Sequence, residues 1–313
     1  MFNTPHAVKK WLVAARPFAL PASTMPVVFG TAAAVTAGGA AFRPGLFLAA
    51  LIGMMLLHTG ANMLSDVTDF RKGLDREVSP VSGAIVRGYL TGAQVRRAAL
   101  GLLVLGSLIG LGLVALVGLP LLWIGLAGVL IGAGYTLGPA LKYHALGDLA
   151  VFLDFGVLGA LGAWTVQTGR PSVLPALWAI PIGLLVIGIL HANNWRDIAT
   201  DRERAGITTV AALLGDRGSL TYYGFLVFAP FAIMTVFVAA RLLSPAAAWG
   251  MPWPALLVWL AFPMALGRWK KALRRATPDH PLDFITLDGA TAQLNLAFGM
   301  LCTAGFVIAK LLA

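Results

Sequence analysis

The amino-acid sequence predicts an all-α membrane protein with nine transmembrane helices and a cytoplasmic N-terminus. Three observations support this fold class: the composition, the apolar windows and the distribution of basic residues. Of the 313 residues, 58% are hydrophobic and only 12% are charged. Soluble domains carry roughly twice that charged fraction, about 25%. Because so few polar residues could not cover a water-facing surface, we expect the chain to lie in a lipid bilayer.

Nine apolar windows are separated by polar segments, and a bilayer core is crossed by about 20 helical residues. Basic residues before the first window resemble the start of a signal peptide, but the window is long enough to remain as a membrane helix. The expected spans are approximately 18–38, 45–64, 98–117, 119–136, 149–168, 174–192, 219–241, 252–268 and 290–311.

The basic residues fix the orientation. With a cytoplasmic N-terminus, 19 of the 23 Lys and Arg residues fall inside, and only Arg43, Arg170, Arg241 and Lys310 fall outside. This asymmetry is typical of membrane proteins, and a missed helix would invert every later segment. The acidic residues also lie at or near the inside, except Asp154, which is deeper in the fifth span. We expect a multi-pass protein of the cell's inner (cytoplasmic) membrane, with a site that opens to the cytoplasm.

Composition also limits the possible partners. The net charge is +10, but no basic soluble segment interleaved with aromatic residues is present, so nucleic acid is not expected as a partner. Membrane lipid is. Cys302 is the only cysteine, which excludes an intrachain disulfide. Residues 1–313 are predicted to form one transmembrane domain, with polar segments at about 65–97 and 193–218.

Two of the inner segments share a pattern of acidic residues. NMLSDVTD has one Asn and two Asp at i, i+4 and i+7, and NNWRDIATD has the same residue types at i, i+4 and i+8. Each set occupies one face of a helix that continues beyond the membrane. The residues are Asn62, Asp66 and Asp69 in the first pattern, and Asn193, Asp197 and Asp201 in the second.

Carboxylates one helical turn apart repel each other, so their clustering does not stabilise a fold. A Mg²⁺ ion removes the conflict, because it takes oxygen ligands and binds through a few carboxylates plus substrate phosphates. A solvated helix end, balanced by nearby Arg and Lys, is the alternative for one pattern alone. Two matched patterns favour Mg²⁺ ions that hold a diphosphate.

A diphosphate also requires cationic or hydrogen-bonding partners. Lys142 is the only cation in the short segment YTLGPALKY, which makes it the strongest candidate. Each cation could instead anchor the topology, and an interfacial Tyr is common in membrane proteins. The candidate diphosphate-binding residues are Lys72, Lys142, Arg196, Arg202 and Tyr135.

These motifs resemble the UbiA superfamily of intramembrane prenyltransferases. NNWRDIATDRERAGITTVAALLG carries the most specific resemblance, and ARPFALPASTMPVVFG, DFRKGLD and YTLGPALKYHALGDL also fit. Within the superfamily, the sequence is most similar to the branch that prenylates 1,4-dihydroxy-2-naphthoate in menaquinone biosynthesis. Two positions depart from the pattern: Ser65 stands where Asn is usual, and Ser79 where this branch often has Arg.

The resemblance implies nine helices around a central cavity that is capped by the polar segments. It implies transfer of an isoprenyl chain from a prenyl diphosphate to an aromatic acceptor, with Mg²⁺ held at the catalytic carboxylates Asp66, Asp69, Asp197 and Asp201. The diphosphate leaves, and an aromatic carbon captures the allylic cation. Candidate acceptor-binding residues are Arg16, His58, Asn194, Arg87 and Asp154. Arg16 or Arg87 would replace the Arg missing at position 79, and His58 could instead be a structural histidine.

Other functions remain open at this point. The same superfamily could use another quinone precursor, a phospho-sugar, a glycerol phosphate or a porphyrin as acceptor, or cyclise its own isoprenyl chain as a terpene cyclase does. A lipid-phosphate transporter is a different class, and would place charge on both sides of the membrane or break helices at mid-depth. The sequence leaves the acceptor, the prenyl chain length and the oligomeric state undetermined.

Overall fold

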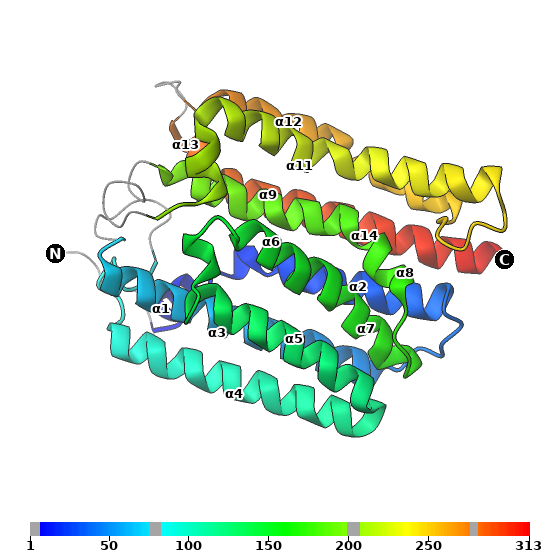
Figure 1. The fold of residues 1–313 in the computed structure, drawn as a ribbon, viewed down its shortest axis with the longest axis horizontal. Coiled ribbons are helices and arrows are strands. Elements are labelled where there is room, and N and C mark those ends of the chain that lie inside the picture. Colours follow the sequence, from blue (N-terminus) through cyan, green and yellow to red (C-terminus); the bar gives the residue numbers. More distant parts are fainter. Residues whose placement is uncertain (1–6, 75–82, 199–206, 276–280) are drawn as a thin grey trace.

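The computed structural model describes residues 7–74, 83–198, 207–275 and 281–313. Within these ranges the secondary structure is helical, apart from one isolated bridge between His144 and Thr208. Long helices run side by side, and the two termini lie at opposite ends of the bundle (Figure 1). The predicted all-α fold class is confirmed.

The described elements follow one another along the chain in two halves. The N-terminal half contains α1 (Ala7–Ala15), η1 (Pro17–Ala19), α2 (Pro21–Thr36), α3 (Pro44–Lys72), α4 (Gly92–Val117), α5 (Leu119–Thr136), η2 (Leu141–Tyr143), α6 (Gly147–Val151), η3 (Phe152–Leu158) and α7 (Gly159–Thr168). The C-terminal half contains α8 (Val173–Trp178), α9 (Ile180–Arg196), α11 (Val210–Leu243), η4 (Trp253–Ala261), α12 (Phe262–Leu273), α13 (Pro281–Ile285) and α14 (Leu287–Leu312).

Six helical segments of the described chain are long and apolar enough to cross a membrane: α3, α4, α5, the run from α6 to α7, α11 and α14. A seventh is obtained if α1 and α2, bent by 54°, count as one span. The predicted spans at 174–192 and 252–268 are each divided, the first between α8 and α9 and the second between η4 and α12. The protein is therefore multi-pass, and the count of nine stays a prediction.

Proline and glycine explain where the helices begin and how closely they pack. A proline at the first or second position starts several helices, where its missing N–H costs no hydrogen bond. These are Pro21, Pro44, Pro120 and Pro181. Gly30 of α2 lies against α7, where an added Cβ would be 2.4 Å from the carbonyl oxygen of Ala160. Such small residues allow close helix packing in lipid.

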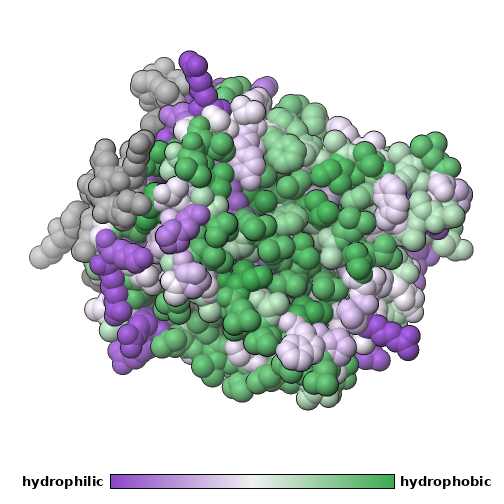
Figure 2. Space-filling model, in the orientation of Figure 1, coloured by the Kyte–Doolittle hydropathy of each residue, from purple (hydrophilic) through white to green (hydrophobic). Residues whose placement is uncertain are grey.

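Hydrophilic residues gather at the end of the bundle that carries α1 and α13, and a hydrophobic band covers the middle (Figure 2). At this polar end, backbone hydrogen bonds join the segments that precede α6 and α11: Thr208 N–H donates to Tyr143, and Ala145 N–H donates to Thr208. The predicted polar segments are partly helical, because α3 continues to Lys72 and α9 to Arg196. These helix extensions carry the acidic patterns beyond the apolar band.

Candidate active site

A cavity of about 440 Å³ lies among α2, α3, α5, η3 and α9 at the polar end. Most of the predicted site residues line it, although they come from segments far apart in the sequence. The lining residues that the sequence had singled out are Arg16, His58, Asn62, Asp66, Asp69, Tyr135, Lys142, Asp154, Asn193, Asn194, Arg196 and Asp197. The two acidic patterns therefore face one shared space.

Two predicted residues that the structure describes do not line it. Lys72 is exposed at the end of α3, with its ammonium 3.8 Å from the ring centroid of Tyr143. Arg87, in the segment before α4, is also absent from the lining. Asp201 and Arg202 lie outside the described residues. The roles predicted for these four residues stay predictions.

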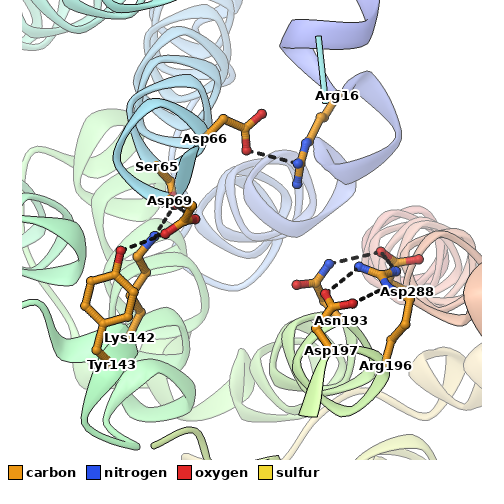
Figure 3. A network of polar contacts seen from close by, with 10 residues as sticks. All are labelled: Arg16, Ser65, Asp66, Asp69, Lys142, Tyr143, Asn193, Arg196, Asp197 and Asp288. Carbon is orange, nitrogen blue, oxygen red and sulfur yellow. Dashed lines mark hydrogen bonds and ion pairs between the residues drawn. The ribbon is translucent and has the colours of Figure 1, made fainter. Parts of the chain in front are cut away.

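Asp69 is the most heavily bonded carboxylate on the α3 side. The Lys142 ammonium lies 2.7 and 2.9 Å from its two oxygens, and the Tyr143 hydroxyl donates to it at 2.6 Å (Figure 3). Ser65 Oγ donates to Asp69 at 3.3 Å and accepts from Lys142 at 2.6 Å. Ser65 therefore forms hydrogen bonds to both Asp69 and Lys142. Its departure from the family pattern did not predict these bonds.

Lys142 reaches Asp69 because the chain turns sharply after α5. Ala140, at the start of η2, has φ 46° and ψ 56°, in the left-handed region that non-glycine residues rarely adopt. The Lys142 side chain is only 10% exposed. Burial lowers the pKa of its ammonium group below the ordinary value, and the neighbouring Asp69 carboxylate opposes that shift.

Asp66 is paired by a residue from the bend between α1 and η1. Arg16 has φ 47° and ψ 56°, and its guanidinium lies 2.9 Å from Asp66. Strained backbone of this kind is concentrated at functional sites. Gly83 packs against the same pair, since an added Cβ would lie 2.9 Å from Asp66 Oδ2. Arg16 is thus bonded to a carboxylate of the α3 pattern, and its predicted role in binding the acceptor stays a prediction.

On the α9 side of the cavity, Arg196 is bonded to two carboxylates. Arg196 lies 3.0 and 3.1 Å from the oxygens of Asp197 and 3.0 Å from Asp288, which lies in the first turn of α14. Asn193 donates to Asp288 at 3.4 Å. Burial lowers the pKa of Arg196, but the two carboxylates outweigh it and raise the value above its ordinary range. This group faces the α3 group across the cavity in Figure 3.

Asp288 and Tyr143 are site residues that the sequence did not single out, and Ser65 was marked only as a departure from the family pattern. Asp288 carried the clearest available signal, because an acid in the first turn of a long apolar helix is costly without a partner. Tyr143 and Ser65 are polar neighbours of predicted residues, and no spacing rule marks them. The position of Tyr143 follows from the turn at η2, whereas Ser65 lies on α3, one helical turn before Asp69.

The part of the cavity away from these cations is more apolar. His58 Nδ1 lies 2.8 Å from Ser23 Oγ, and its ring centroid is 4.7 Å from that of Phe155. Ile131, Val186 and Leu190 also line the space. Asp154 of η3 is the acid that the sequence placed deeper in the membrane, and it too lines the cavity. A ligand with an anionic end and an apolar body matches this division.

The donor set fits Mg²⁺ in its chemistry. The acidic and amide side chains offer only oxygen ligands from both sides of the cavity, namely Asn62, Asp66, Asp69, Asn193, Asp197 and Asp288. Within the described residues, no three His, Cys, Asp or Glu side chains converge on one point. Four of the carboxylates are instead bonded to Arg16, Lys142 and Arg196. Metal binding would therefore exchange these ion pairs.

Comparison with known sequences covers nearly the whole chain. UbiA prenyltransferase domain-containing protein 1 from Mus musculus is 33% identical over 307 residues, which are 97% of this chain and 85% of that protein. The 1,4-dihydroxy-2-naphthoate octaprenyltransferase of Bacillus subtilis is 32% identical over 295 residues, 94% of this chain and 90% of that enzyme.

Solved structures share the fold. A UbiA homologue from Aeropyrum pernix superposes with a TM-score of 0.66 at 19% identity, covering 94% of this chain and 98% of that one. A UbiA homologue from Archaeoglobus fulgidus bound to DMAPP and Mg²⁺ gives 0.56 at 16% identity, covering 94% and 99%. The model of the UbiA prenyltransferase family matches residues 23–287. The chain therefore belongs to the UbiA prenyltransferase family.

Proposed function

We propose that this protein is a Mg²⁺-dependent enzyme that transfers an isoprenyl chain from a prenyl diphosphate to an aromatic acceptor, 1,4-dihydroxy-2-naphthoate. The observation that carries the proposal is the shared cavity between two acidic helix ends, each of which is bonded to cations. The B. subtilis relative supports the acceptor, whereas the name of the Mus musculus relative specifies none.

Two sets of oxygen donors would hold the metal. Asn62, Asp66 and Asp69 form the set on α3, and Asn193, Asp197 and Asp288 form the set that α9 and α14 share. Asp201 was predicted for the second set and lies outside the described residues. When bound, Mg²⁺ would stabilise the negative charge that develops on the diphosphate as the bond to the prenyl carbon breaks.

The chain's own cations bind the same anion. Arg16, Lys142 and Arg196 all line the cavity, and each is bonded to a carboxylate. Charge-assisted hydrogen bonds from these donors to phosphate oxygens would replace those pairs. The apolar lining from Ile131, Phe155 and Val186 suits the prenyl chain and keeps water from the allylic cation.

The proposal includes nine spans with a cytoplasmic N-terminus in the inner membrane, so that the cavity opens to the cytoplasm. The opposite placement of the termini (Figure 1) and the asymmetry of the basic residues support it. Cys302 is buried, so introduced cysteines can be labelled selectively. A membrane-impermeant maleimide should label Arg170→Cys in intact cells and His144→Cys only after lysis. The reverse pattern would contradict the orientation.

Mass spectrometry of the products tests the reaction itself. The purified protein is incubated with mixed prenyl diphosphates and a panel of acceptors, with Mg²⁺ or EDTA. We expect a prenylated naphthalene that has lost carbon dioxide, formed only with Mg²⁺. A different prenylated acceptor would change the substrate, and a cyclised hydrocarbon without acceptor mass would indicate a terpene cyclase. No Mg²⁺-dependent release of diphosphate with any pair would overturn the proposal.

A further inference from the structure

Asp154 differs from the other carboxylates that line the cavity within the described part of the chain. Asp66, Asp69, Asp197 and Asp288 are all bonded to Arg or Lys side chains. Asp154 lines the same cavity, yet among residues 7–74, 83–198, 207–275 and 281–313 no hydrogen bond or ion pair reaches its oxygens. This acid is therefore available to a ligand without displacing a protein cation.

The neighbouring helix leaves room for this carboxylate. Gly128 and Gly132 of α5 face it, and an added Cβ would lie 3.0 Å from Oδ1 at Gly128 and 3.6 Å from Oδ2 at Gly132. Asp154 itself lies in η3, a π-helix between α6 and α7. Single π-turns are rare in helices and are frequently found at functional sites. The π-helix and the two glycines thus accommodate an acid at the cavity wall, at a position where an apolar side chain would avoid the cost of a buried charge.

The position along α5 gives its depth. Tyr135 lies near the cationic end, since an added Cβ on Gly147 would be close to both Tyr135 and Lys142. Gly132 and Gly128 precede Tyr135 by roughly one and two helical turns, or about 5 and 10 Å along the axis. Asp154 therefore lies about 5 to 10 Å along the helix axis from the end that suits a diphosphate. This distance is about the length of one fused aromatic ring system.

The chemistry of the partner follows from the charge. An unpaired carboxylate at membrane depth is costly and gains a strong, charge-assisted bond from a hydroxyl donor. It repels phosphate and carboxylate groups, and a prenyl chain offers it no hydrogen bond. Within this cavity, the group that suits Asp154 is therefore the hydroxyl of an aromatic ring.

We propose that Asp154 is a specificity-determining residue, which accepts a hydrogen bond from a ring hydroxyl of the acceptor and so selects hydroxylated aromatic compounds. This inference rests on the proposed prenyl transfer, because it assigns Asp154 to the acceptor of that reaction. It also implies that any acceptor carboxylate points away from Asp154, toward the cationic end.

Ligand binding tests the inference without turnover. The thermal midpoint of the detergent-solubilised protein is measured anaerobically with 1,4-dihydroxynaphthalene or with 1,4-dimethoxynaphthalene. We expect only the dihydroxy compound to stabilise the wild type. Its affinity should fall about tenfold in Asp154→Asn, because a neutral acceptor forms a bond roughly half as strong. Asp154→Leu should abolish the preference and raise the ligand-free midpoint, which shows that the variant is folded.

Two glycine variants provide a matched pair. Gly128→Ala places a methyl group against the Asp154 carboxylate and should weaken binding of the dihydroxy compound. Gly125→Ala is one turn away on the same helix, in open space, and should bind as the wild type does. Equal stabilisation of wild type and Asp154→Leu, or none of the wild type, would overturn the inference.

The donor half of the reaction is measured separately with geranyl thiodiphosphate and Mg²⁺. We expect this compound to stabilise the wild type and Asp154→Leu equally. Failure of the donor to bind either protein would count against the proposed prenyl transfer and leave the hydroxyl preference of Asp154 intact. A donor effect that is lost only in Asp154→Leu would instead place Asp154 at the diphosphate and refute its assignment to the acceptor.

Discussion

The two acidic helix ends are alike in sequence, but their charges are balanced differently. On α3, Asp66 pairs with Arg16 and Asp69 with Lys142, so each carboxylate is bonded to a cation from another segment. At the end of α9, Arg196 bonds to two carboxylates, Asp197 and Asp288. The similar spacing of Asn and Asp therefore indicates that the two helix ends bind similar ligands. The stability of each end, however, depends to a different degree on its cations.

The largest effect is expected when one carboxylate on either side is neutralised. Asp69→Asn and Asp197→Asn should each lower kcat by roughly 10³, the scale reported when one transition-state contact of the active site is removed. Steady-state assays of diphosphate release measure the loss. Equal losses would mean that both ends bind metal. Near-normal activity of Asp197→Asn would mean that only the α3 end binds metal, and that the two acidic helix ends do not have the same function.

Replacing the cations should expose the difference between the two ends. Arg196→Gln removes an ion-pair partner from two carboxylates in a group where Asp288 is only 8% exposed, and should cost about 3 kcal/mol of stability. Arg16→Gln removes a partner from one carboxylate and should cost about 1 kcal/mol, since Arg16 is 25% exposed. Thermal unfolding in detergent compares the two variants. Equal losses would show that sharing one cation has no energetic consequence.

Metal-linked donor binding is the next effect in size. A prenyl thiodiphosphate at about 100 times its Kd should stabilise the protein by about 2.7 kcal/mol. We expect that gain only with Mg²⁺, because the three cavity cations are already bonded to carboxylates. The measurement is the thermal midpoint with Mg²⁺ or EDTA. Equal stabilisation in EDTA would mean that the cations alone hold the diphosphate.

The sequence predicted the helical class and the acidic patterns because both depend on local periodicity. The apolar windows at 45–64 and 119–136 became α3 and α5, and Asn62, Asp66 and Asp69 share the cavity-facing side of α3. The pairing of Arg196 with Asp288 could not be predicted, because it joins residues 92 positions apart through helix packing. The same holds for Arg16, whose left-handed backbone at the α1–η1 bend directs it to Asp66.

The smallest effect is expected outside the cavity. There, two cations share one carboxylate, whereas in the cavity Arg196 is one cation that bonds to two carboxylates. Asp283 of α13 is bonded to two cations, Arg274 at 2.9 Å and Lys271 at 3.6 Å. The hydrogen bond from Arg274 lowers the pKa of this carboxyl below its ordinary value. A lowered carboxyl pKa gives stability that is present above the unfolded-state pKa and is lost as the pH falls through the folded-state value.

Asp283→Asn should therefore reduce stability slightly at neutral pH and match the wild type in strong acid, because its partner Arg274 is 47% exposed and solvent screens the pair. Thermal midpoints of both proteins between neutral pH and strong acid, in low and high salt, measure this difference. The gap should narrow as the pH falls and as salt is added. A loss at neutral pH as large as that of Arg196→Gln would mean that the number of shared partners, and not burial in the cavity, sets the cost of breaking these ion pairs.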